Sequence, residues 1–329
     1  MTEIQEQRYR RVPQMRSYDN LGSVWHPYIM YFHTPNYSTS HVTTDNFGFR
    51  HSIFNGTKLS PINPPSSSSV SLVVGASTAF GVGAEDDTGT IASHLAELTA
   101  EPWLNLGGRA YTAFQEFALY AHFASRLPKV KTVLIVSGFN NLFLAQRSLP
   151  FELPLGAFYF QQAFEQGMQS ATSGRFKRLV EIIRPNRSTP VPSRRSANEV
   201  IRLATETTCQ SLELWKSVLA PAGTRIIFAL QPTAFWSDHK PSGAEAELFS
   251  LLERIDPNLN DAFMRLDKSL YIGYRDSLQT RLAELGVDFI DLNAELPRHG
   301  VTEELTYVDR VHFTSSGYRR IAKALQQSL

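Results

Sequence analysis

From Val70 onward, short apolar runs alternate with longer helical patterns, and this alternation restricts the folds open to the chain. The candidate strands are residues 70–75, 102–106, 132–137, 225–231 and 288–292. Between and after them, apolar residues recur at spacings of three and four, as on amphipathic helices. Strands that alternate with helices form a mainly parallel sheet with helices on both faces. We therefore expect an α/β domain built on a sheet of about five parallel strands.

The composition argues against several classes of function. The 329 residues carry 32 Lys and Arg against 31 Asp and Glu, so no global field attracts nucleic acid or an anionic membrane. The sequence lacks both an apolar run of bilayer length and a signal-peptide pattern. Cys209, the single cysteine, can form neither an intrachain disulfide nor a zinc cluster, and we expect it on an apolar helix face. These features predict a cytoplasmic protein with no membrane span and no nucleic-acid partner; its oligomeric state stays open.

Two segments do not follow the alternation. Residues 1–69 are rich in Tyr, His, Asn, Thr and Pro and end in PINPPSSSSV, which predicts a loop or hairpin extension and a flexible connector. We expect this extension to pack on a catalytic domain formed by residues 70–329. The second segment is an insertion at about 151–200 that contains the Pro- and Arg-rich stretch 184–196. That stretch is typical of a disordered surface loop, and an anion-binding lid is the alternative.

A serine follows the first candidate strand, in Gly75-Ala76-Ser77-Thr78. Ligands gather at the carboxyl ends of parallel strands, and small neighbours let a substrate carbonyl come close to a hydroxyl. Ser77 therefore lies where a nucleophile is expected. By itself the stretch is more typical of an ordinary turn, because Gly-x-Ser-Thr is common in turns, so the interpretation needs partner residues.

Candidate oxyanion donors follow the next two strands. The second strand ends in LNLGGRAY, and the third is followed by Gly138-Phe139-Asn140-Asn141. Acyl transfer needs N–H donors directed at the oxygen that becomes negative, and each contributes about 3 kcal/mol. The Asn140 side-chain amide and backbone N–H groups can serve, although an isolated Asn140 is also typical of a turn.

Near the end of the chain, YVDRVHFTSSGY places Asp309 three residues before His312. A serine hydroxyl becomes a good nucleophile when an imidazole accepts its proton and a further group orients that imidazole. The spacing puts both side chains on one side of a tight loop or helical turn. A helix-capping Asp and a packed His remain the alternative. Asp238 and His239 form the only other candidate pair, but adjacent side chains point apart.

These four stretches, in this order, resemble the conserved blocks of the SGNH hydrolases, also called GDSL-type esterases and lipases. GAST resembles the nucleophile block, NLGGRAY the second block, GFNN the third and DRVH the Asp-x-x-His block. TTDNFGFR at 43–50 further resembles the subgroup whose nucleophile block reads like GGSTTFG. The resemblance covers residues 70–329. It implies a flavodoxin-like three-layer α/β/α sandwich with a parallel sheet of about five strands.

The resemblance also assigns roles to residues. It implies Ser77 as nucleophile, His312 as general base and acid, and Asp309 as the group that orients His312. It implies an oxyanion hole formed by the Ser77 N–H, the Asn140 side chain and a backbone N–H of the second block, at Ala110 or alternatively at Gly108.

The sequence departs from the family pattern at three positions. Ala76 and Asn141 stand where the family usually has Asp, and Ala110 stands where it has Gly. A backbone donor survives the change to Ala110, although the added methyl group can shift the turn.

Three functions follow from this interpretation. The first is an ester hydrolase that works through an acyl-enzyme on a small-molecule, carbohydrate or lipid ester, with no metal and no cofactor. The second is an acyltransferase that uses the same site and a hydroxyl acceptor instead of water. The third is an inactive binding protein that retains the fold, against which Ser77, Asn140, Asp309 and His312 argue.

Overall fold

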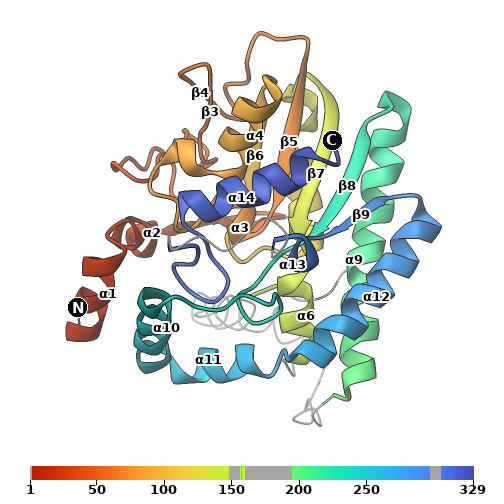
Figure 1. Ribbon diagram of the computed structural model, residues 1–329. Coiled ribbons are helices and arrows are strands. Elements are labelled where there is room, and N and C mark those ends of the chain that lie inside the picture. Colours follow the sequence, from red (N-terminus) through yellow and green to blue (C-terminus); the bar gives the residue numbers. More distant parts are fainter. Residues whose placement is uncertain (1, 148–155, 157, 160–194, 297–304) are drawn as a thin grey trace, which may run out of the picture.

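The computed structural model describes residues 2–147, 156, 158–159, 195–296 and 305–329. Within them, the main sheet has five parallel strands in the order β6-β5-β7-β8-β9 (Figure 1). The strands are β5 (Ser69–Gly75), β6 (Trp103–Gly107), β7 (Lys129–Ser137), β8 (Arg225–Leu230) and β9 (Asp288–Asp291). This is the flavodoxin-like strand order, with the first strand between the second and third. The prediction of a five-stranded parallel sheet is confirmed.

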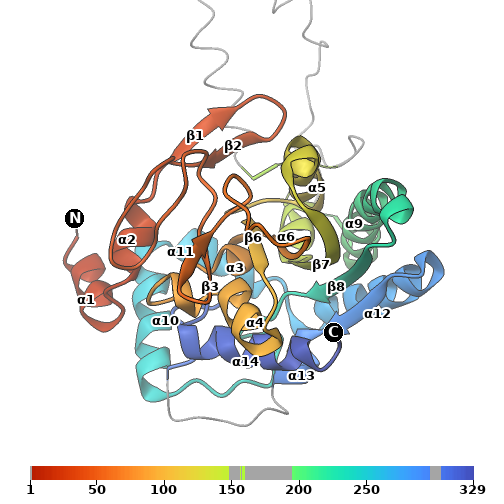
Figure 2. The same cartoon turned by 90° about the horizontal axis from the view of Figure 1, so that it is seen from above.

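Helices cover both faces of the sheet, as Figure 2 shows. On one face lie α4 (Ile91–Thr99) and α14 (Ser315–Gln326), and on the other α5 (Ala113–Phe123), α9 (Ala197–Leu219) and α12 (Lys268–Leu285). Alternate residues of β5 supply the two cores, because side chains along a strand point to opposite faces. Leu72 packs in the core under α5, α9 and α12, whereas Val73 packs in the core under α4 and α14. The three-layer α/β/α sandwich is thereby confirmed.

Several helices were not foreseen from the sequence. They are α1 (Glu3–Arg11), α2 (Met15–Asn20), α6 (Phe139–Gln146), α10 (Gly243–Ile255) and α11 (Pro257–Met264). A start signal was present for α10, because Ser242 and Glu245 form a capping box. Helices α10 and α11 lie beyond the carboxyl ends of the strands, where a ligand of the sheet would bind (Figure 1).

The extension at residues 1–69 has more regular structure than the loop or hairpin expected. After α1 and α2 come two antiparallel hairpins. They are formed by β1 (Ser23–His26) with β2 (Met30–His33), and by β3 (Ser52–Phe54) with β4 (Thr57–Leu59). Tyr9, Met15 and Tyr18 are buried in one apolar cluster with Phe80 and Val308 of the sheet domain. Short helices with few apolar residues give weak sequence signals, because contacts with the rest of the fold stabilise them.

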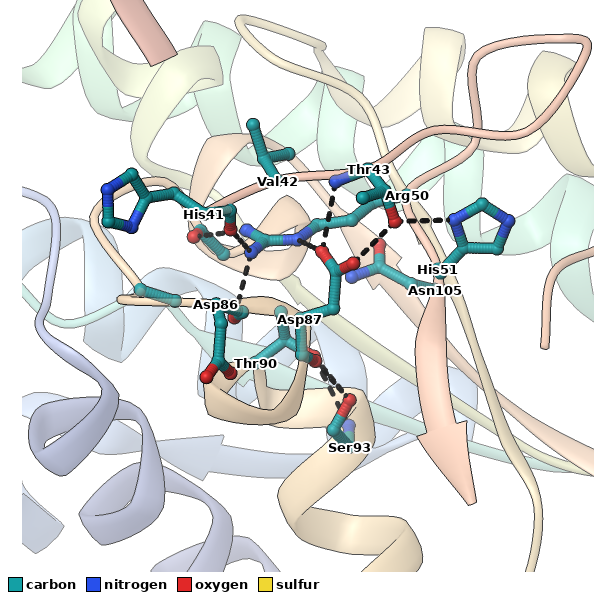
Figure 3. A network of polar contacts seen from close by, with 12 residues as sticks. His41, Val42, Thr43, Arg50, His51, Asp86, Asp87, Thr90, Ser93 and Asn105 are labelled. Atoms are coloured by element: carbon teal, nitrogen blue, oxygen red, sulfur yellow. Dashed lines mark hydrogen bonds and ion pairs between the residues drawn. The ribbon is translucent and has the colours of Figure 1, made fainter. Parts of the chain in front are cut away.

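A buried arginine connects the extension to the segment that follows Ser77 (Figure 3). The Arg50 side chain is fully buried and donates hydrogen bonds to the Tyr18 hydroxyl and the Gly81 carbonyl, both at 2.7 Å. Its Nε lies 3.1 Å from Oδ1 of Asp87, and Oδ2 of the same carboxylate accepts the Thr43 hydroxyl. These bonds satisfy a charge that would be very costly to bury alone.

The structure bears on three other predictions to different extents. Cys209 is buried in α9, as expected. Most of the proposed insertion at 151–200, including nearly all of the 184–196 stretch, falls outside the described residues; its end overlaps α9, which begins at Ala197. Within the described part of the chain, no helix combines the length and hydrophobicity needed to cross a bilayer.

Candidate active site

Ser77 lies at the junction of β5 with α3 (Ser77–Phe80), at the carboxyl end of the sheet. Gly75 makes this junction possible, because its φ of 147° is in a region that residues other than glycine rarely adopt. A Cβ atom at Gly75 would lie 2.1 Å from the Val136 carbonyl oxygen on β7. The close approach of β5 and β7 therefore requires glycine two residues before Ser77.

His312 and Asp309 reach Ser77 from the other end of the chain. The His312 Nε2 lies 2.7 Å from the Ser77 Oγ, and its Nδ1 lies 2.7 Å from an oxygen of Asp309. With its proton on Nδ1, the neutral ring has Nε2 free to accept the serine proton. The other Asp309 oxygen accepts the N–H groups of Val311 and His312, each at 2.8 Å. The three-residue spacing works because the loop wraps around one carboxylate.

The surroundings of Asp309 keep it ionised. Burial by itself would raise the pKa of this carboxyl, but the charge and hydrogen bond of His312 and the Val311 N–H outweigh it and lower the pKa to about 2. A permanent negative charge beside the ring stabilises the imidazolium form of His312.

Helix α10 holds the loop that carries these two residues. The loop closes on itself through a bridge between Tyr307 and Phe313. An oxygen of the buried Glu245 accepts the N–H groups of Thr306 at 3.0 Å and Tyr307 at 2.9 Å. Burial opposes ionisation of Glu245, but its hydrogen bonds with His239 and with backbone N–H groups lower its pKa to about 2. Glu245 is thus a charged anchor that the sequence analysis did not identify.

The weaker candidate pair of the sequence, Asp238 and His239, does not form a unit. The His239 Nε2 lies 2.9 Å from Glu245, and Asp238 pairs instead with Lys268 at 2.5 Å. His239 thereby helps to fix Glu245, which holds the loop that carries Asp309.

The predicted oxyanion donors Ser77, Ala110 and Asn140 all line one cavity. Asn140 is near the start of α6, and its Nδ2 donates to the Tyr111 carbonyl at 2.7 Å, which orients the amide and leaves its second N–H available. The alternative donor Gly108 is already occupied, because its N–H donates to the Gly75 carbonyl at 2.9 Å. Within the described chain, the Ala110 and Ser77 N–H groups have no hydrogen-bond partner. Ala110 is therefore the second-block donor that the geometry favours.

Ser77 and His312 line a cavity of about 490 Å³. One part of its lining is apolar: Phe139, Leu252, Ile255, Leu259, Phe263 and Val311. Another part is polar. Gln5, Arg8 and Asp19 of the extension belong to it, together with residues from elsewhere in the chain: Arg109, Gln231, Asp256, Asn260 and Arg310. A volume of this size fits a small organic ligand. The sequence analysis did not identify α10, α11 or α1 as cavity walls.

A metal centre is not evident in the described ranges. No group of three or more His, Cys, Asp or Glu side chains among those residues is arranged to hold an ion.

Comparisons with known proteins find similar structures but no similar sequence. No family model matches the chain, and no curated protein matches it. An extracellular lipase from Streptomyces rimosus is 12% identical, with 80% of this chain and 100% of that chain covered and a TM-score of 0.44. A member of the lipolytic protein G-D-S-L family from Veillonella parvula is 12% identical, with 79% and 97% covered and a TM-score of 0.43. An acetyl xylan esterase is 10% identical, with 79% and 99% covered and a TM-score of 0.39.

Proposed function

We propose that this protein is a serine-dependent ester hydrolase of the SGNH type. The observation that carries the proposal is the continuous chain of hydrogen bonds from Ser77 through His312 to Asp309, with both contacts of His312 at 2.7 Å. A nucleophile, a base and an orienting carboxylate at these distances are what acyl transfer through a serine requires.

The proposed reaction begins when the Ser77 Oγ attacks the carbonyl carbon of the ester and its proton passes to the His312 Nε2. The C–O bond to the alcohol then breaks, and His312 returns that proton to the leaving oxygen. This gives a free alcohol and an acyl group on Ser77. Water repeats the cycle: it loses a proton to His312, attacks the acyl carbon and releases the acid, while Ser77 regains its proton.

The negative oxygen of the tetrahedral intermediate would receive hydrogen bonds from the Ser77 N–H, the Ala110 N–H and the Asn140 amide. Donors that are fixed in place before the reaction lower the barrier without reorganising. The unpaired N–H groups at Ser77 and Ala110 support this assignment. No metal and no cofactor takes part in the scheme.

The cavity supports a substrate with two unlike parts. We propose an ester in which an apolar group lies against the wall of α10, α11 and Phe139, and a polar group lies toward Arg8 and Asp19. Small-molecule, carbohydrate and lipid esters all include compounds of this kind. The same acyl-enzyme could pass its acyl group to another hydroxyl instead of water, and product analysis distinguishes the two outcomes.

A fluorophosphonate probe tests the proposal, because it reacts covalently with an activated serine. We expect the wild type to be labelled and Ser77→Ala to remain unlabelled. Ser67→Ala, which changes an exposed serine in the connector before β5, should be labelled like the wild type. A folded wild type that takes no label would contradict the proposal. A panel of p-nitrophenyl esters and acetylated sugars would then define the acyl group.

A further inference from the structure

The turn that carries Ala110 is held in a conformation that its own sequence does not favour. Ala110 has a φ of 60°, in the left-handed region. For a residue with a Cβ atom this conformation costs about 1–2 kcal/mol. Contacts with other parts of the chain therefore have to impose this conformation, and with it the direction of the Ala110 N–H.

Those contacts come from the N-terminal extension, and they fix the peptide groups on both sides of the candidate donor. The His33 Nε2 accepts the Arg109 N–H at 3.1 Å, which holds the peptide group between residues 108 and 109. The Tyr31 hydroxyl donates to the Ala110 carbonyl at 2.9 Å, which holds the peptide group between residues 110 and 111. Between them lies the peptide whose N–H belongs to Ala110. With its two neighbours fixed, the direction of this N–H is determined.

The tautomer of His33 agrees with this role. Its Nδ1 lies 3.0 Å from the Gly48 carbonyl, which can only accept, so the ring proton is on Nδ1 and Nε2 must be an acceptor. His33 is 2% exposed, and burial, with the nearby Arg109, lowers its pKa well below the usual value. The ring is therefore neutral, as its bond to the Arg109 N–H requires.

Further bonds lock the extension and the turn together. The Tyr111 hydroxyl donates back to the Tyr31 carbonyl at 2.5 Å. The Arg109 guanidinium donates to the carbonyl groups of Tyr18 and Leu21. The turn and the extension thus exchange hydrogen bonds in both directions, across about 80 residues of sequence.

We propose that Tyr31 and His33 are positioning residues that direct the Ala110 N–H at the oxyanion, so that the extension is part of the catalytic apparatus. The proposal rests on the function proposed above. It explains how an alanine can stand at this position, where glycine would be more permissive. Contacts from the extension hold the left-handed backbone conformation, which alanine by itself does not favour.

Tyr31→Phe tests the proposal, because it removes one hydroxyl and keeps the ring that packs against Tyr111 at 5.6 Å. We expect kcat to fall about tenfold or more with little change in KM, since a displacement of about 1 Å at a reacting group can cost up to ~10²-fold. Tyr37→Phe is the matched control, because its hydroxyl donates to the Ser17 carbonyl inside the extension and not to the turn. That variant should keep the wild-type kcat.

A spectroscopic readout separates positioning from general loss of stability. The carbonyl stretch of an acyl-enzyme moves to higher frequency when hydrogen bonds to its oxygen weaken. We expect this shift in Tyr31→Phe and not in Tyr37→Phe. A Tyr31→Phe variant with the same kcat and carbonyl frequency as Tyr37→Phe would overturn the proposal.

His33 gives a second test that does not depend on the first. His33→Gln keeps an acceptor for the Arg109 N–H and a donor for the Gly48 carbonyl, whereas His33→Leu offers neither. We expect kcat to be higher in His33→Gln than in His33→Leu among variants that fold, and equal values would overturn the role of His33. Failure of the proposed function is distinguishable, because it would leave the wild type itself unlabelled by fluorophosphonate and inactive.

Discussion

Asp309 uses its two carboxylate oxygens for two different tasks. One oxygen accepts the backbone N–H groups of Val311 and His312, which fixes the shape of the loop, and the other meets the His312 ring. A single side chain therefore determines both where His312 lies and which ring nitrogen carries the proton. This explains in physical terms why the two residues are three positions apart.

Asp309→Asn should lower kcat by about 10⁴-fold, because the amide no longer orients the ring in the tautomer that accepts a proton. The measurement is steady-state turnover, with circular dichroism to show that the variant is folded. The pKa of Asp309 is about 2, so this carboxyl is ionised throughout the range above pH 4. Its protonation therefore should not cause a loss of activity between pH 4 and pH 8. Activity close to that of the wild type would mean that another group orients His312.

At the scale of elements, a hydrogen bond between α5 and β7 holds a carboxyl group that is buried in the protein. Glu116 is 1% exposed and accepts the Ser137 hydroxyl at 2.6 Å, while its other oxygen has no partner among the described residues. Burial raises its pKa from 4.5 to about 8, although the bond from Ser137 opposes the shift. The side chain is therefore protonated in the folded protein at neutral pH.

Glu116→Gln should stabilise the protein at neutral and alkaline pH. Below pH 4.5 both states bind the proton, and this group adds no pH dependence. As pH rises toward 8, the unfolded chain releases the proton and the folded chain keeps it, so the wild type loses stability, by about 3 kcal/mol at pH 7. Urea unfolding from pH 4.5 to 8 should show the advantage of the variant growing with pH.

The exposed Glu213 on α9 gives the control for this experiment. Glu213→Gln should change stability by less than ~0.5 kcal/mol at every pH. If Glu116→Gln behaved in the same way, Glu116 would be ionised in the folded protein, and the interpretation of its burial would be wrong.

At the scale of the whole molecule, Arg50 connects the extension to the segment just after Ser77. Its guanidinium donates to the Tyr18 hydroxyl and the Gly81 carbonyl. It also donates to the Asp86 carbonyl and pairs with Asp87, as Figure 3 shows. Because these partners come from both regions, the extension and the sheet should unfold together.

Arg50→Met should lower the free energy of unfolding by about 3–5 kcal/mol, because it removes the buried cation beside Asp87. The remaining cation, the exposed Lys58 at 3.7 Å, is a poor substitute. Arg225→Met is the matched control, since Arg225 and its partner Asp288 are about half exposed, at 45% and 54%. Loss of that surface pair should cost less than ~1 kcal/mol. Similar losses in the two variants, measured by urea unfolding, would show that the Arg50 network adds little to stability.

The sheet could be predicted from the sequence because its signals are local. Strands buried on both faces give continuous apolar runs, and the helices between them repeat at their own period. All five predicted strands agree with β5 to β9 to within three residues at each end. The helices α1, α2, α10 and α11 were missed because contacts with distant segments, such as Val308 with the extension, stabilise them.

For the candidate site, the sequence by itself determined which side chains are available: Ser77, Asn140, Asp309 and His312, each next to a strand end or in a tight loop. Their catalytic roles stay predictions. The tertiary structure alone decided which backbone N–H is free, because the Gly108 N–H is bonded to Gly75 and the Ala110 N–H is not. It also decided what holds that donor, since Tyr31 and Ala110 are 79 positions apart. Hydrogen bonds between such distant segments exist only once the core has packed, and no local pattern in the chain encodes them.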